Sequence, residues 1–114
     1  MSITYDDSHK KTVESGTEAV REVLFGGNTL EIRKLLFCLD LYLDPYYKNT
    51  LPYEPEIYDL LQELAVTSRD DDVIDDCLQL IDNYSCSSLA ILEHGFDRIK
   101  DSMKPYAQYI LNKP

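Results

Sequence analysis

The feature that most constrains this chain is an apolar pattern that recurs in three segments. The pattern I-x-x-L-L-x-x-L, or a close variant of it, occupies residues 32–39, 57–64 and 74–81. Residues three and four positions apart lie on the same side of an α-helix, so this spacing gathers the apolar side chains on one helical face. No segment of the sequence shows the sustained two-residue alternation of a half-buried strand. The sequence therefore predicts an all-α fold.

The recurrence itself has two interpretations. Any amphipathic helix of a globular protein tends to show such spacing. Stacked helical hairpins of the HEAT type also show it, because each hairpin buries its apolar stripe against its neighbours and leaves an extended surface for a partner. Short connections between the segments favour antiparallel neighbours. We expect antiparallel helical hairpins, five to six helices in total, with HEAT-like stacking as one of the two interpretations.

Capping signals set the limits of the central helices. Asn28 and Glu31 have the spacing of a capping box, and Asp44 precedes a proline, which disfavours helical backbone before it. Pro55 suits a first helical turn, and Asp70 is an N-cap residue ahead of the third repeat of the pattern. These signals predict helices that begin near residues 28, 55 and 70.

The two ends of the chain are less regular. Residues 1–11 mix charged and hydroxyl side chains without an apolar period, which predicts a flexible N-terminal arm. A first helix is expected to follow the arm. Its apolar face is formed by Val13, Val20, Val23 and Leu24, and the Gly26-Gly27 pair is expected to end it. Toward the other end, Ser87 or Ser88 is expected to cap a helix, and Pro105 to lie near a helix start or to kink one. At 114 residues we expect one helical domain over residues 12–114.

The charge balance narrows the choice of partner. The chain has 21 acidic and 11 basic residues, a formal net charge of -10. Binding of nucleic acid depends on Lys and Arg that neutralise phosphates, so nucleic acid is a poor partner for this chain. A basic protein suits it better, although acidity also serves solubility alone.

The cysteines and the amino terminus indicate the compartment. Cys38, Cys77 and Cys86 include no CxxC pair, and the odd count favours free thiols in a reducing environment. The amino terminus has no apolar core of a signal peptide, and no segment approaches the length of a membrane span. We expect a cytoplasmic protein that does not insert into membranes.

The carboxylates at Asp70, Asp71, Asp72, Asp75 and Asp76 raise the question of a metal site. A calcium-binding loop of the EF-hand type needs Gly at its sixth position and Glu at its twelfth, and counting from Asp70 these are Asp75 and Ile81. His9 and His94 have no cysteine at metal-ligand spacing. Standard phosphate, dinucleotide, zinc and hydrolase motifs are absent from the sequence. We therefore expect no enzymatic activity, no cofactor, no metal and no small-molecule substrate.

Tyrosine is the unusual residue type, with nine in the chain and no tryptophan. Tyr46, Tyr47, Tyr53 and Tyr58 cluster around one loop and the helix after it. Tyrosine offers a large contact area with a polar tip, which suits recognition surfaces, but it also packs at the edge of a core. The five aspartates between residues 70 and 76 are either a solvated helix start or part of a binding surface. We expect the partner to contact these aspartates and the four tyrosines.

The repeated I-x-x-L-L-x-x-L helices, followed by DDDVIDDCLQLIDNY, resemble the small acidic immunity proteins with which bacteria neutralise polymorphic nuclease toxins, including those of contact-dependent inhibition systems. The resemblance spans residues 28 to 112. It implies a stoichiometric inhibitor that covers the basic active site of a toxin, and it carries over no site residues, because such families share no catalytic residues. The alternative is a helical-repeat adaptor or scaffold that binds an ordinary cellular protein.

Overall fold

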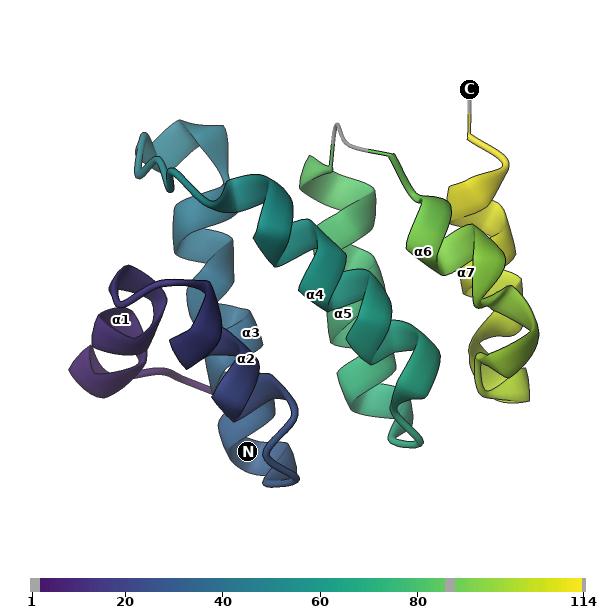
Figure 1. Ribbon diagram of the computed structural model, residues 1–114, viewed down its shortest axis with the longest axis horizontal. Coiled ribbons are helices and arrows are strands. Elements are labelled where there is room, and N and C mark those ends of the chain that lie inside the picture. Colours follow the sequence, from purple (N-terminus) through teal and green to yellow (C-terminus); the bar gives the residue numbers. More distant parts are fainter. Residues whose placement is uncertain (1–2, 86–87, 114) are drawn as a thin grey trace. The chain divides into compact units, whose positions relative to one another are not determined.

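The computed structural model describes residues 3–85 and 88–113, and the fold over them is all-α, as predicted (Figure 1). These residues form seven α-helices, more than the expected five to six, and three short 3-10 turns. In chain order the elements are α1 (Asp7–Glu14), α2 (Thr17–Leu24), α3 (Thr29–Leu43), η1 (Pro45–Tyr47), α4 (Glu54–Thr67), α5 (Asp71–Tyr84), α6 (Ala90–His94), η2 (Phe96–Arg98), η3 (Asp101–Met103) and α7 (Lys104–Leu111).

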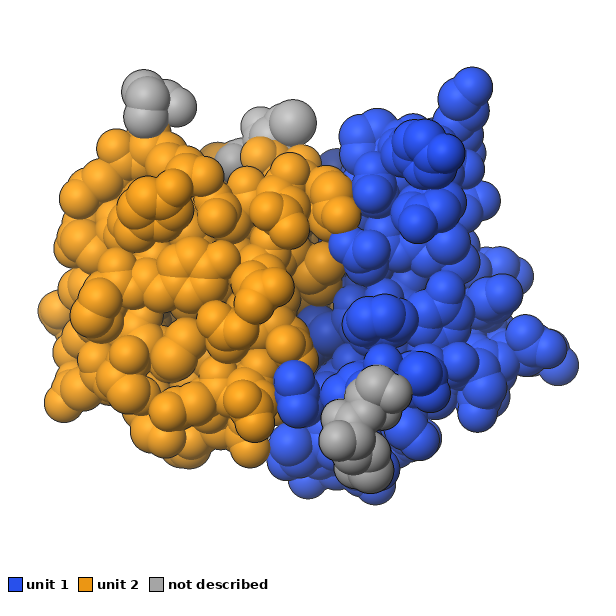
Figure 2. All heavy atoms as spheres, turned by 180° about the vertical axis from the view of Figure 1, so that it is seen from behind, with its two compact units in different colours: residues 1–57 blue, residues 58–114 orange. Residues whose placement is uncertain are grey.

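The chain divides into two compact units, residues 1–57 and residues 58–114 (Figure 2). The division falls inside α4, so that the first turn of this helix belongs to the first unit and the remainder to the second. The expectation of a single helical domain over residues 12–114 stays a prediction.

Helix α1 occupies part of the expected loose arm. Its N-cap is Asp6, whose carboxylate accepts a hydrogen bond from the Ser8 amide at 2.9 Å. His9 Nδ1 accepts in return from the Asp6 amide at 3.1 Å, which completes a capping box. His9 and Val13 are both buried. Residues 7–11 therefore belong to a packed helix and do not form a flexible arm.

A glycine divides the expected first helix into α1 and α2. Gly16, the N-cap of α2, has φ of +112°, a conformation that side chains with a Cβ rarely adopt. The chain therefore changes direction between Val13 on α1 and Val20 on α2, and both valines remain fully buried. Helix α3 packs against both α1 and α2 in the first unit.

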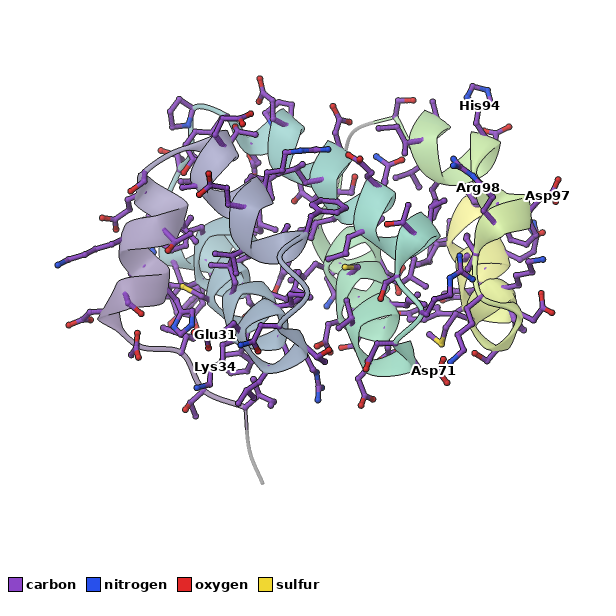
Figure 3. All side chains as sticks on the ribbon, turned by 60° about the horizontal axis from the view of Figure 1, so that its bottom comes forward. Glu31, Lys34, Asp71, His94, Asp97 and Arg98 are labelled. Carbon is purple, nitrogen blue, oxygen red and sulfur yellow. The ribbon has the colours of Figure 1, made fainter. Side chains whose placement is uncertain are left out.

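The predicted limits of α3 are confirmed. Asn28 Oδ1 caps the helix by accepting from the Glu31 amide at 3.1 Å, and the helix ends at Leu43, before Asp44 and Pro45. The Glu31 carboxylate lies instead 3.5 Å from His9 Nε2 and 3.8 Å from Lys34 Nζ (Figure 3). The capping box expected from sequence is therefore half formed, and Glu31 links α3 to α1.

In the second unit, α4 and α5 follow one another through the turn at residues 68–70 (Figure 1). Asp70 caps α5, as predicted, and the apolar stripes of both helices are buried. Leu61 of α4 and Leu78 of α5 are both fully buried, and Cys77 lies in the same core. Cys38 and Cys77 are free thiols, as predicted, and Cys86 lies outside the described residues.

Gln62 joins α6 to α4 from inside the core. Its side chain is fully buried, its Nε2 donates to the Ser88 carbonyl at 3.2 Å, and its Oε1 accepts from the Leu92 amide at 3.0 Å. Ser88 Oγ also accepts from the Ala90 amide at 3.3 Å at the start of α6. Ser87, the other residue expected to cap this helix, lies outside the described residues.

Gly95 ends α6, and it does so at a point of close packing. A Cβ at this position would lie 2.7 Å from a methyl carbon of Val66, so only glycine fits without movement. The chain continues through η2 and η3 into α7, which has Pro105 in its first turn, as the sequence indicated. Helix α7 and η3 both pack against α5.

Candidate functional site

The five aspartates at the start of α5 have different structural roles. Asp70 is the N-cap, with Oδ1 accepting from the Val73 amide at 3.0 Å. Asp71, labelled in Figure 3, pairs with Lys100 Nζ at 2.7 Å and accepts from Ser102 Oγ at 2.8 Å. The Lys100 and Ser102 hydrogen bonds hold the pKa of Asp71 below its usual value. Asp70 and Asp71 are thus engaged in the fold of the second unit.

The other three aspartates form a surface, which we call the α5 acidic face: Asp72, Asp75 and Asp76. Asp72 is exposed, whereas Asp75 and Asp76 are half-buried. Their spacing of three and four residues places them on one side of α5, opposite the buried stripe. Asp75 Oδ2 accepts from Gln79 Nε2 at 2.6 Å, and exposed Gln79 and Asn83 continue the same side of the helix.

The four tyrosines fall into two classes. Tyr46 and Tyr47 on η1 are 81% and 49% exposed, and their rings meet edge to face with centroids 5.3 Å apart. Tyr53 is half-buried and Tyr58 is buried. The surface interpretation therefore applies to Tyr46 and Tyr47, whereas Tyr53 and Tyr58 pack as residues of a core or its edge.

The predicted residues do not belong to one unit. The five aspartates lie in the second unit, Tyr46, Tyr47 and Tyr53 lie in the first, and Tyr58 is the first residue of the second. Each group is accordingly a surface of its own unit. The α5 acidic face contributes three carboxylates to the surface of the second unit. The Tyr46–Tyr47 pair contributes two exposed aromatic rings to the surface of the first.

A hollow in the second unit was not found from sequence. It has a volume of about 370 Å³ and is lined by residues of α6, η2, α7 and the residue after α7, namely Glu93, Phe96, Asp97, Gln108, Leu111 and Asn112. These residues come from two segments that are separated in the sequence, so no local sequence motif predicts that they lie together. The one available signal is the pair Glu93 and Asp97, two carboxylates four residues apart on either side of Gly95.

Exposed apolar side chains on α3 were also missed. Leu30 is 42% exposed and Phe37 is 52% exposed, and their spacing of seven positions places both on one side of α3. The Phe37 ring lies 5.5 Å from that of Tyr5, centroid to centroid. The apolar positions of the repeated template mark the buried side of this helix, whereas Leu30 precedes the template and Phe37 occupies one of its unspecified positions.

The buried cysteines are poorly suited to nucleophilic chemistry. Burial raises the pKa of the Cys38 thiol to about 11 and that of Cys77 still further. Both thiols remain protonated at neutral pH, whereas a nucleophile needs the thiolate. Across the described ranges, no group of three or more His, Cys, Asp or Glu side chains is arranged to hold a metal ion. No helix within residues 3–85 or 88–113 is long and apolar enough to cross a bilayer.

Comparisons of the chain with protein-family models, with curated proteins and with solved structures find no match. The function is therefore inferred from the three surfaces described above: the α5 acidic face, the lined hollow and the exposed side of α3.

Proposed function

We propose that this protein is an immunity-type inhibitor, which binds a basic protein partner through the α5 acidic face. The partner that best suits such a face is a cognate nuclease toxin whose basic active site the inhibitor covers, in the cytoplasm of the cell that makes both. The observation that carries the proposal is the α5 acidic face itself, three carboxylates on the outer side of a helix whose inner side is buried.

Charge supports this partner class. Residues 58–114 contain 11 acidic and 5 basic side chains, so the second unit carries most of the excess negative charge of the chain. An enzyme that cuts nucleic acid needs a basic cleft, and complementary charge speeds the encounter of two proteins and excludes partners of the wrong sign. An acidic inhibitor of a basic nuclease gains both advantages.

A second candidate is a helical adaptor for an ordinary cellular protein. The exposed Leu30 and Phe37 on α3 favour it, since exposed apolar residues on one helix side are typical of a partner surface. This candidate requires the α3 surface for binding and assigns no role to the α5 acidic face, so substitutions distinguish the two.

The test begins with the protein encoded by the reading frame next to this one. That protein is purified, its nuclease activity is measured, and the present chain is added at equal molar amounts. We expect the activity to be abolished at a one-to-one ratio. Full nuclease activity in the presence of a molar excess, or no nuclease activity in the neighbour at all, would contradict the proposed partner.

The surface is tested by association kinetics across a salt series. Replacement of Asp72, Asp75 and Asp76 by Asn is expected to lower the association rate constant about tenfold at low salt and to flatten its salt dependence, with little change in dissociation. Asp71 is left intact because it pairs with Lys100.

The matched control removes three charges from the first unit, by replacement of the exposed Glu18, Glu22 and Glu56 with Gln. If the control slows association as much as the Asp variant, net charge alone governs the encounter and the α5 acidic face has no special role. If replacement of Leu30 and Phe37 by Ala abolishes binding while both charge variants bind normally, the adaptor function is favoured.

A further inference from the structure

The lined hollow of the second unit brings together three kinds of side chain. Glu93 at the end of α6 and Asp97 on η2 supply carboxylates, and Gln108 and Asn112, on and just after α7, supply amides. Phe96 and Leu111, both half-buried, supply apolar surface. At about 370 Å³ the hollow falls within the range of small-ligand pockets.

The two carboxylates carry unbalanced charge. In the part of the chain that the structure describes, neither Glu93 nor Asp97 makes an ion pair. Figure 3 shows Asp97 at the outer edge of the unit, pointing away from the side chain of its neighbour Arg98. Both carboxylates line the hollow, so a cation bound in it gains from the negative charge of each.

The remaining lining suits a planar cation with an apolar stem. Gln108 Nε2 donates to Asn112 Oδ1 at 3.0 Å, which leaves the side-chain oxygen of Gln108, Oε1, as a further acceptor. The Phe96 ring offers an aromatic face, and such faces attract guanidinium groups. Lys104 Nζ lies 6.0 Å from the centroid of this ring and pairs with Asp101 at 3.0 Å, so one cation already lies within reach of the ring.

We infer that this hollow binds the guanidinium group of an arginine side chain presented by the protein partner. Guanidinium is planar, carries five N–H donors and stacks on aromatic rings, so it can donate to two carboxylates while it contacts Phe96. The ammonium of lysine is a compact and strongly hydrated charge, which uses the ring and the amide acceptor less well. The inference rests on the proposed function, because a basic partner is what supplies the arginine.

The test uses the complete chain, a small probe and no partner. Nα-acetyl-arginine amide is titrated into the labelled protein at low salt, and amide chemical shifts are followed by NMR. Nα-acetyl-citrulline amide, which has nearly the same shape and no charge, and Nα-acetyl-lysine amide are the matched probes. We expect saturable shifts at Phe96, Asp97, Gln108, Leu111 and Asn112 with the arginine probe, and weaker binding of the other two.

Two variants locate the binding. Replacement of Glu93 by Gln together with Asp97 by Asn is expected to weaken the arginine probe about tenfold, given two partly exposed ion pairs. Replacement of Asp72 and Asp75 by Asn removes the same charge from the α5 acidic face and is expected to leave the probe's affinity unchanged. The circular dichroism spectrum of each variant confirms that the helices persist.

Equal binding of citrulline or lysine amide would overturn the inference, and so would shifts centred on residues 72–79 in place of the hollow. Loss of binding in the Asp72 and Asp75 variant would overturn it too. The readout involves no toxin, so failure here leaves the kinetic test of the α5 acidic face intact. A chain that fails to inhibit its neighbour can likewise still bind the probe, and the two failures are distinguishable.

Discussion

Gln62 shows how a single buried side-chain amide can hold a short helix, α6, against its neighbour α4. It binds the Ser88 carbonyl and the Leu92 amide, so its loss removes a partner from two backbone groups, of which the Leu92 amide is buried. We predict that replacement of Gln62 by Leu lowers the free energy of unfolding by about 2–4 kcal/mol, because leaving a buried polar group unsatisfied costs more than a hydrogen bond contributes. Urea unfolding followed by circular dichroism measures the loss.

The control for this prediction is replacement of Gln79 by Leu on the exposed side of α5, which is expected to change stability by less than about 0.5 kcal/mol. A loss at Gln62 as small as that at Gln79 would show that water reaches Ser88 and Leu92 readily.

Tyr42 is expected to make the first unit sensitive to alkaline pH. Its hydroxyl donates to Glu14 Oε2 at 2.7 Å, and burial, followed by this hydrogen bond and the Glu14 charge, raises the pKa of Tyr42 well above its ordinary value. A group whose pKa is raised by folding contributes stability below its unfolded pKa, near 10, and that contribution falls as pH rises beyond it. We predict that stability falls above about pH 10 and that replacement of Tyr42 by Phe flattens this fall.

At pH 7 the same variant should lose about 1 kcal/mol through the missing hydrogen bond. Thermal unfolding between pH 7 and pH 11 measures both effects, with replacement of the exposed Tyr46 by Phe as the control. An unchanged slope in the Tyr42 variant would mean that other groups govern the alkaline loss.

At the scale of the element, the buried stripes of α4 and α5 should dominate stability. Leu61 and Leu78 are both fully buried. We predict that replacement of either by Ala costs about 2–5 kcal/mol, the range for removal of a buried leucine side chain. Replacement of Leu30 by Ala on the exposed side of α3 is the matched control and should cost less than about 1 kcal/mol. Chemical denaturation of the three variants gives the comparison.

Helix α1 depends on its cap. We predict that replacement of Asp6 by Ala lowers stability measurably, whereas replacement by Asn has a much smaller effect, because Asn caps a helix as well as Asp does. Urea unfolding at neutral pH measures the difference. Equal losses in the two variants would show that the charge of Asp6, and not its cap, stabilises α1.

The elements also show what sequence can and cannot predict. Helices α3, α4 and α5 follow from sequence because a regular apolar stripe agrees with a capping residue in α3 and α5 and with Pro55 in the first turn of α4. The first part of α1, residues 7–11, was missed because this helix buries only His9 and Val13 and uses a histidine in its capping box. The hollow was missed for another reason: Glu93 and Gln108 become neighbours only when α6 and α7 pack, which no local pattern encodes.

At the scale of the whole molecule, the net charge of -10 opposes compact folding through self-repulsion. The ion pairs Asp71–Lys100 and Lys104–Asp101 are partly exposed and contribute little, so screening should remove more repulsion than attraction. We predict that an increase in NaCl from 10 to 150 mM, which shortens the Debye length from about 30 to about 8 Å, stabilises the fold on the order of 1 kcal/mol. Melting temperatures across a salt series measure this, and a fall with added salt would contradict it.

The run of aspartates at the start of α5 has a consequence for how this chain tolerates variation. Asp70 and Asp71 hold the helix start and η3, whereas Asp72, Asp75 and Asp76 lie on the outer side of the same helix. In a saturation library scored separately for cellular abundance and for protection against a toxin, substitutions at residues 70 and 71 should lower both scores together. Substitutions at residues 72, 75 and 76 should lower protection more than abundance, so the acidic run would divide into two groups of positions with different phenotypes.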